Sequence, residues 1–282
     1  MGETETYTEP VETAREYYNS EDADNFYYTI WGGEDIHVGL YRSDDESIYD
    51  ASQRTVERMA SYCEQLDGDA SDLRILDMGA GYGGAARYLA KTYGCEVVAL
   101  NLSEVENAKD REMNRDQGLD HLITVVDGNF EDVPEPDNSF DIVWSQDSFL
   151  HSAEREQVMQ EAARLLKEGG EFIFTDPMQA DDCPPGVLQP ILDRIHLESL
   201  GSPSFYREQA EKLGLEELRF DEQTENLTRH YSRVLEETEQ HEEELRGKVS
   251  QDYIGHMKEG LQHWIDGGEQ DYLAWGIFHF KS

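Results

Sequence analysis

Long apolar runs are missing from this 282-residue sequence. No stretch approaches the roughly 18 consecutive apolar residues that a membrane span requires. The first ten residues, MGETETYTEP, are acidic and polar, whereas a signal peptide begins basic and continues apolar. Cysteine is also scarce, and the three cysteines lie far apart without a CxxC pair, which predicts neither a disulfide framework nor a zinc site. We therefore expect a soluble, cytoplasmic protein with reduced thiols.

Positive charge is scarce as well. The chain has 23 lysines and arginines against 62 acidic residues, which gives a formal net charge of −39. Such a surface repels nucleic acids and anionic membranes, so we expect neither as a partner. The acidic residues are spread along the whole chain and do not form one tail. This distribution favours adaptation to a salty cytoplasm over an ordinary acidic protein.

Several catalytic signatures are absent too. The nine histidines form neither an HxH nor an HExxH pattern, so we expect no metal site. The sequence also contains no GxSxG motif of a hydrolase and no Walker loop.

What the sequence does contain is a regular alternation of strand-like and helix-like segments. Apolar runs typical of strands occur at 74–78, 96–101, 122–126, 140–144 and 171–175. Amphipathic segments typical of helices lie between them, at 83–93, 104–117 and 152–168. Strands that alternate with helices of this length predict βαβ units with right-handed crossovers, and hence an α/β fold with a doubly wound parallel sheet.

The segments outside this core are less regular. We expect residues 1–24 to be frayed and residues 47–66 to form a helix that packs on the sheet. After the fifth strand we expect helices at 186–200 and 204–213 and a further strand at 215–221. A long acidic helical insertion at about 226–266 and a last strand at 273–280 should follow. Gly94, Gly118 and Gly169 are placed as left-handed C-terminal caps, and Ser103 with Glu106 as a capping box.

The stretch LDMGAGYGG at 76–84 follows the first predicted strand. A glycine-rich turn that opens a helix lets the backbone approach a ligand closely and directs N–H groups at it. Gly79, Gly81 and Gly84 satisfy the dinucleotide pattern GxGxxG, with Asn101 about 20 residues further on, where an NAD enzyme has Asp or Glu. The motif alone does not choose between nucleotide cofactors.

Three features together are more specific than the glycines. These are Asp77 before the first glycine, the turn VDGNF at 126–130, and LLKEGGEFIFTD at 165–176. In this order they resemble the class I S-adenosyl-L-methionine-dependent methyltransferases. The resemblance implies a Rossmann-like, seven-stranded, mostly parallel sheet and S-adenosyl-L-methionine as the cofactor.

The same resemblance implies a set of cofactor-binding residues at the carboxyl ends of the strands, where ligands bind in doubly wound sheets. Asp77 and the loop Gly79, Ala80, Gly81 and Gly83 would hold the amino-acid part of the cofactor. Asn101 would bond the ribose hydroxyls, Asp127 the adenine amino group, and Leu102 and Phe130 would stack on the ring. The remaining candidates in these turns are Gly128, Asn129, Ser145 and Gln146.

A narrower resemblance appears in FYYTIWGGEDIHVGLY (26–41), WSQDSFLHS (144–152) and LGSPSFYREQAEKLGL (200–215). These segments are similar to the glycine, sarcosine and dimethylglycine N-methyltransferases that make glycine betaine in halophilic microbes. Related patterns occur in tocopherol, phosphoethanolamine and natural-product methyltransferases. The resemblance implies N-methylation of sarcosine, N,N-dimethylglycine or both, with a small zwitterionic amine as substrate.

Positive charge builds on the nitrogen during such a transfer, and aromatic faces hold methylated ammonium groups by cation–π contacts. We expect these faces to come from Tyr27, Tyr28 and Trp31 in the N-terminal segment, and from Tyr206. For each of them, a place in the apolar core is the alternative.

The substrate carboxylate calls for an arginine, which binds it through two parallel hydrogen bonds. Arg207, next to Tyr206, is the first candidate and Arg42 the second. His151, just after the fourth strand, could accept the amine proton or only orient the amine. Asp176 and His37 are further candidates for lining the pocket.

We expect three parts in the chain: an acidic N-terminus with an aromatic helical lid (1–70), the cofactor-binding α/β core (71–182), and helical substrate-side segments with the insertion and the last two strands (183–282). Two alternatives to the amine methyltransferase remain open. One is a methyltransferase of another small nucleophile, such as a phenolic or prenylated natural product or a phospho-base. The other is an NAD-dependent dehydrogenase or a catalytically silent binding module. The sequence leaves monomer and homo-oligomer equally open.

Overall fold

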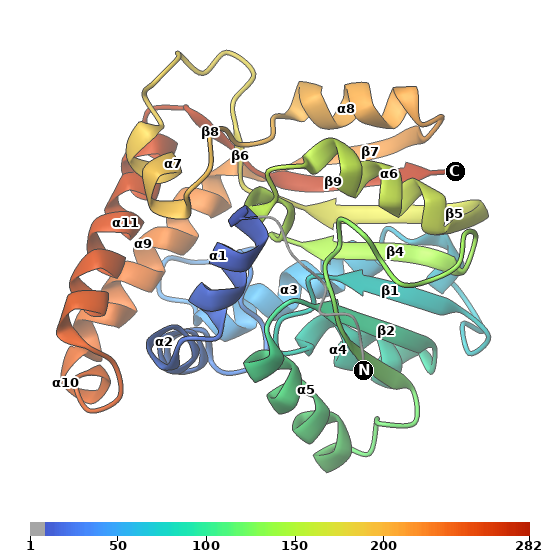
Figure 1. Ribbon diagram of the computed structural model, residues 1–282, viewed down its shortest axis with the longest axis horizontal. Coiled ribbons are helices and arrows are strands. Elements are labelled where there is room, and N and C mark those ends of the chain that lie inside the picture. Colours follow the sequence, from blue (N-terminus) through green and yellow to red (C-terminus); the bar gives the residue numbers. More distant parts are fainter. Residues whose placement is uncertain (1–8) are drawn as a thin grey trace.

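The predicted strands form the centre of one sheet in the computed structural model, which describes residues 9–282 (Figure 1). The strand order is β3-β2-β1-β4-β5-β9-β7. Strands β1 to β5 are paired in parallel, and β9 runs antiparallel to both β5 and β7. The bounds are β1 Arg74–Met78, β2 Glu96–Asn101, β3 Ile123–Asp127, β4 Phe140–Gln146, β5 Leu166–Thr175, β7 Glu216–Glu222 and β9 Gly276–Lys281. The doubly wound, mostly parallel seven-stranded sheet is therefore confirmed.

Both faces of the sheet are covered, because alternate side chains of each central strand point to opposite faces. Ile75 and Val97 belong to a core cluster with residues of α3 (Ile48–Ala60) and α4 (Gly84–Tyr93). Leu76 and Val98 belong to a second cluster with residues of α6 (Arg155–Leu165) and α8 (Pro203–Lys212). This two-sided burial explains why the strands are near-continuous apolar runs. The 3₁₀ turns η1 (Glu64–Leu66) and η2 (Phe149–His151) lie in the connections.

Helix α5 (Glu104–Asp116) differs from the amphipathic helix that we predicted at 104–117, because its buried face is polar. Glu106, Asn107, Asp110 and Asn114 are all buried on it. Buried Arg87 of α4 pairs with Asp110 at 2.8 Å and donates to the Asn114 side chain at 3.2 Å. As a result, α5 carries polar groups next to the carboxyl ends of β2 and β3.

The N-terminal segment is helical and not frayed as far as it is described. Helix α1 covers Glu9–Tyr18 and α2 covers Glu21–Trp31. Ser20 is the N-cap of α2, and its Oγ accepts a hydrogen bond from the Ala23 N–H. Arg15 of α1 forms an ion pair with Glu104 at the start of α5. The part of the prediction that concerns residues 1–8 lies outside the described residues.

The acidic insertion forms α9 (Thr224–Gln240), α10 (Glu242–Leu245) and α11 (Gln251–Glu269). Its apolar residues join those of α2 in a third core cluster, and α11 also contacts the short helix α7 (Gln189–Ile195). Figure 1 shows α1, α2, α7 and the insertion gathered beyond the carboxyl ends of the parallel strands. These helices form a helical cap over the edge of the sheet where ligands bind in this architecture.

Two predicted boundaries differ from the structure. Strand β5 begins before residue 171, so Gly169, with φ +75°, lies inside the strand and does not cap a helix. The predicted last strand is split, because β8 (Leu273–Ala274) pairs with β6 (Met178–Gln179) in a separate two-stranded sheet. Among residues 9–282, no helix has the length and apolarity to cross a bilayer.

Candidate active site

The glycine loop packs tightly on its neighbours. Gly79 has φ +84°, and a Cβ at this position would lie 2.2 Å from Ser148 Oγ, so only glycine fits between β1 and the loop after β4. The N–H groups of Gly79 and Ala80 donate to the Leu100 carbonyl at 2.8 and 3.0 Å. These two amides therefore fix the loop on β2 and are not free for a ligand.

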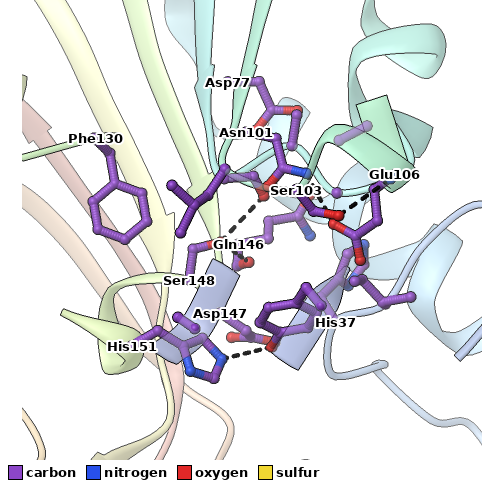
Figure 2. A pocket seen from close by; sticks show the side chains of 18 of the residues that line it. His37, Asp77, Asn101, Ser103, Glu106, Phe130, Gln146, Asp147, Ser148 and His151 are labelled. Carbon is purple, nitrogen blue, oxygen red and sulfur yellow. Dashed lines mark hydrogen bonds between the residues drawn. The ribbon is translucent and has the colours of Figure 1, made fainter. Parts of the chain in front are cut away.

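A first cavity opens beside this loop, at the carboxyl ends of β1, β2 and β4 (Figure 2). Figure 2 shows Asn101, Ser103 and Glu106 grouped on one side of it and Phe130 on the opposite side. Helix α1 closes it with Val11, Ala14 and Tyr18. The structure brings together nine of the predicted cofactor-binding residues in its lining: Asp77, Gly79, Ala80, Gly81, Asn101, Leu102, Asn129, Phe130 and Gln146.

Asp77 brings an unpartnered carboxylate oxygen to this cavity. Its side chain is buried, with 2% of the residue exposed, and Oδ2 has no hydrogen-bond partner among the described residues. Burial, together with a smaller effect of the neighbouring Asp110, raises the pKa of Asp77 to about 8. A cationic group in the cavity would supply the missing partner.

Asn101 acts together with Glu106, a residue that the sequence analysis used only as a helix cap. Ser103 Oγ accepts from the Glu106 N–H at 3.2 Å, which is half of the predicted capping box. The Glu106 carboxylate instead accepts from Asn101 Nδ2 at 2.8 Å and lines the cavity. Burial raises the pKa of Glu106 to about 7, against the opposing effect of Asn101. The pair leaves Asn101 Oδ1 and one Glu106 oxygen as acceptors for hydroxyl groups.

Four predicted cofactor-binding residues do not line the first cavity. Asp127 is about half exposed and is held outside by α5, whose Arg111 pairs with it at 2.8 Å and whose Asn107 donates to it at 2.8 Å. Gly128 packs against Leu100. Buried Ser145 donates to the Met78 carbonyl at 2.6 Å. Gly83 is the N-cap of α4, and a Cβ at this position would lie 2.2 Å from Asp110 Oδ1.

A second cavity, of about 1100 Å³, lies under the helical cap. It shares part of its lining with the first cavity: Ala14, Tyr18, Ile36, His37, Asp147 and His151. Tyr18 Oη and His151 Nε2 are 2.8 Å apart, and their rings meet edge-on. We call the shared residues Tyr18, His37, Asp147 and His151 the junction. His151 and His37, both predicted site residues, therefore lie where the two cavities meet.

Two residues of the junction, His151 and Tyr18, are neutral, whereas His37 and Asp147 can carry charge. Burial lowers the pKa of His151 to about 4, with a smaller contribution from the positive charge of nearby Arg155. Burial also raises the pKa of Tyr18 well above its ordinary value. Asp147 accepts from the Val38 N–H at 2.6 Å and from Trp275 Nε1 at 2.7 Å. Burial raises the pKa of Asp147, while His37 partly opposes this change. Against the lowering effect of burial, Asp35 at 3.3 Å raises the pKa of His37. Asp147 is therefore the junction residue that suits a ligand group on which positive charge develops.

Aromatic rings cover much of the second cavity. Tyr27 and Trp31, both predicted, line it with ring centroids 5.1 Å apart. The sequence analysis missed Tyr17, Tyr18, Tyr231, Tyr253 and Trp264, which also line it. They come from α1 and the insertion, and neither of these segments carries a motif next to a strand end.

The other two predicted aromatics are elsewhere. Tyr28 is 45% exposed, with the Lys109 ammonium over its ring. Tyr206 is fully buried and donates to Asp176 Oδ2 at 2.7 Å, while Asp176 Oδ1 accepts from the Leu150 N–H at 2.8 Å. Asp176 and Tyr206 thus hold the η2 turn that carries His151, and neither lines either of the two cavities.

Neither predicted arginine lines the first or the second cavity. Arg207 is exposed, pairs with Glu217 at 2.8 Å and lies over the Phe220 ring. Because Tyr206 points into the sheet, the next residue on α8 points outward. Arg42 is exposed on a loop. Arg194 of α7, which the sequence analysis did not consider, does line the second cavity.

One group of possible metal ligands occurs among the described residues, formed by buried Cys63, Glu171 and His279. Glu171 already bonds His279 Nε2 at 2.6 Å and accepts from the N–H groups of Glu64 and Gln65. Since hydrogen bonds within the chain satisfy this carboxylate, we assign the cluster a structural role.

Known proteins resemble the chain along almost its whole length. A family model described as "Methyltransferase domain" matches residues 76–174. A sarcosine/dimethylglycine N-methyltransferase of Halorhodospira halochloris is 64% identical, over 96% of each chain. A protein of the same name from Aphanothece halophytica is 55% identical, over 95% of this chain and 96% of its own length. A crystal structure of a proposed sarcosine dimethylglycine methyltransferase from Galdieria sulphuraria has a TM-score of 0.89 and 43% identity, over 94% of this chain and 98% of that one.

Proposed function

Because this chain belongs to the family of the sarcosine/dimethylglycine N-methyltransferases, we propose that it methylates the nitrogen of sarcosine, of N,N-dimethylglycine or of both. The methyl donor is S-adenosyl-L-methionine and the final product is glycine betaine. The observation that carries this proposal is the pair of cavities that meet at Tyr18, His37, Asp147 and His151. Family membership sets aside the dehydrogenase alternative.

The residues of the first cavity fit the cofactor. The unpartnered Asp77 oxygen suits its ammonium group, and the acceptors of Asn101 and Glu106 suit the two ribose hydroxyls. Leu102 and Phe130 supply apolar faces for the adenine ring. When bound, the cofactor supplies an electrophilic methyl group on a sulfonium.

The junction aligns the amine and excludes water, which together account for much of the rate of an in-line methyl transfer. Asp147 and the tyrosine rings stabilise the positive charge that develops on the nitrogen. His151, with a pKa of about 4, holds a proton far more weakly than an aliphatic amine does. It therefore orients the amine and Tyr18, and the amine reaches the junction already deprotonated.

Radiolabelled methyl transfer to glycine, sarcosine and N,N-dimethylglycine tests this proposal, with each amine assayed at low and at high salt. We expect incorporation with sarcosine, with dimethylglycine or with both. Activity with none of the three amines at either salt concentration would contradict the proposal.

The volume of the second cavity favours one further candidate. About 1100 Å³ is large for an amine of a few heavy atoms, so methylation of a larger phospho-base or natural product is the second function to test. The same assay with phosphoethanolamine and phenolic acceptors separates the two. A higher kcat/KM for one of these acceptors would favour the second function.

A further inference from the structure

The second cavity combines many acidic residues with one arginine. Glu16, Glu21, Asp22, Asp147, Asp193 and Glu259 contribute to its lining. Among the described residues that line either cavity, Arg194 is the one lysine or arginine. A carboxylate that enters this acidic cavity needs a compensating cation, and this residue is the candidate that the structure offers.

Arg194 has donors to spare. Its Nη1 donates to the His256 carbonyl at 2.9 Å, and its Nη2 lies 2.6 Å from Met257 Sδ. No described carboxylate forms an ion pair with it, although the chain is rich in such pairs, for example Arg54 with Glu46. A guanidinium has five N–H donors, so Arg194 can still bind a carboxylate through two of them.

The position of the guanidinium depends on Gly260, in the middle of α11. A Cβ at Gly260 would lie 2.3 Å from Arg194 Nε and 2.6 Å from its Cζ. Glycine is among the least favourable residues inside a helix, yet here it lets the arginine lie flat against the helix. Gly255, earlier on the same helix, has nothing within 4 Å of its Cβ position.

A continuous set of contacts leads from Arg194 to the junction. Met257 Sδ, next to Arg194, is 3.6 Å from the Tyr17 hydroxyl, and the Tyr17 and Tyr18 rings are 5.1 Å apart. Tyr18 in turn bonds His151. Arg194 and the junction thus line the same cavity, with the Tyr17 and Tyr18 rings between them.

Building on the proposed function, we propose that Arg194 binds the carboxylate of the amine substrate and that Gly260 sets specificity by holding the guanidinium in place. Amines without a carboxylate gain nothing from this contact. Arg194 and Gly260 therefore select N-methylated amino acids over amines of similar size that lack a carboxylate.

A rival site for the carboxylate is a pair of neutral donors. Trp31 Nε1 and His230 Nε2 are buried and have no partner among the described residues, and their rings are 5.5 Å apart. His230 Nδ1 accepts from the Gly39 N–H at 3.2 Å, so the neutral ring carries its proton on Nε2. These donors supply hydrogen bonds without charge, and the experiment has to separate them from Arg194.

The test compares Arg194→Gln, Gly260→Ala, the control Gly255→Ala and Trp31→Phe. KM is measured for sarcosine and dimethylglycine, and equilibrium binding of dimethylglycine is measured by calorimetry on the protein saturated with S-adenosylhomocysteine. We expect Arg194→Gln to raise the amine KM by about 10- to 100-fold and to leave cofactor binding unchanged. Gly260→Ala should raise this KM by about fivefold, and Gly255→Ala by less than about twofold.

The variants also report on specificity. Wild type should prefer dimethylglycine over dimethylethanolamine, which lacks the carboxylate, and Arg194→Gln should reduce this preference by about tenfold or more. An unchanged KM in Arg194→Gln, or a large KM increase confined to Trp31→Phe, would overturn the assignment and leave the proposed function intact. Arg194-dependent binding of dimethylglycine without methylation would instead contradict the proposed function alone.

Discussion

The two cavities differ in how the chain builds them. The first takes most of its lining from the turns that follow β1, β2, β3 and β4, and a parallel sheet places these turns at one edge. The second takes its lining mainly from α1, α2, α7, α9 and α11, which lie far apart in the sequence and pack in an order that no strand dictates. A cavity at strand ends can therefore be located from sequence, whereas one between capping helices needs the structure.

The cavities also differ in their charge. The first holds buried carboxylates with raised pKa values, about 8 for Asp77 and about 7 for Glu106. The second holds acidic residues too, but it adds aromatic rings, neutral donors and the cationic Arg194. If each cavity binds its own ligand, a substitution in one should leave the affinity for the other ligand unchanged.

Asp77→Asn should have the largest effect, because it removes the charge that faces the cofactor ammonium. We expect a loss of about 100-fold in affinity for S-adenosylhomocysteine by calorimetry, or about 3 kcal/mol. The amine KM at saturating cofactor should not change. Asp127→Asn is the matched control, because Asp127 pairs with Arg111 outside the cavity. Equal losses in the two variants would show that Asp127 also contacts the cofactor.

The pH dependence of cofactor binding should be the next largest effect. Asp77 is protonated below about pH 8 in the free protein, and the cofactor ammonium requires the ionised form. Affinity should therefore fall as pH falls, by at most about tenfold for each unit between pH 8 and 7. Below pH 7 the decrease should steepen, because Glu106 then also gains a proton. Calorimetry in Asp77→Asn should show a change of less than about twofold between pH 7 and 8, which is the contribution that Glu106 leaves.

Tyr18→Phe tests the junction, the region common to both cavities. Loss of the hydrogen bond to His151 should lower kcat by about fivefold, because the histidine loses its orientation. Both KM values should change by less than about twofold, since the ring remains. A large change in either KM with kcat intact would show that Tyr18 binds a ligand directly.

Arg207→Ala should have the smallest effect. The ion pair with Glu217 is exposed, and such pairs contribute about 0 to 1 kcal/mol to stability. The amine KM should remain within about twofold of wild type in steady-state assays. A tenfold increase would return Arg207 to the carboxylate-binding role that its neighbour Tyr206 suggested in the sequence.

The site residues show in physical terms where sequence reasoning succeeds. Asp77 and Asn101 lie at the ends of strands that the apolar pattern locates, and Phe130 lies just after one, so their places at the first cavity were predictable. Asp127 ends a strand as well, but Arg111 and Asn107 on the polar face of α5 draw it away. A pattern search sees the strand end and not the helix that competes for the side chain.

Glu106 and Arg194 were missed for different reasons. The spacing of Ser103 and Glu106 predicts a reciprocal cap, and the competing bond from Asn101 that turns the carboxylate into the cavity is not encoded in that spacing. Arg194 depends on a contact between α7 and a glycine of α11. Glycines inside the helical insertion were the available signal, but the sequence does not tell that Gly260, and not Gly255, faces an arginine.

Helix α1 covers the first cavity with Val11 and Ala14 and also forms one side of the second with Tyr17 and Tyr18. Because one helix contributes to both compartments, a movement of α1 that admits the donor compound would also open the amine compartment. Turnover should therefore follow a compulsory sequence, with the donor first in and its spent form last out.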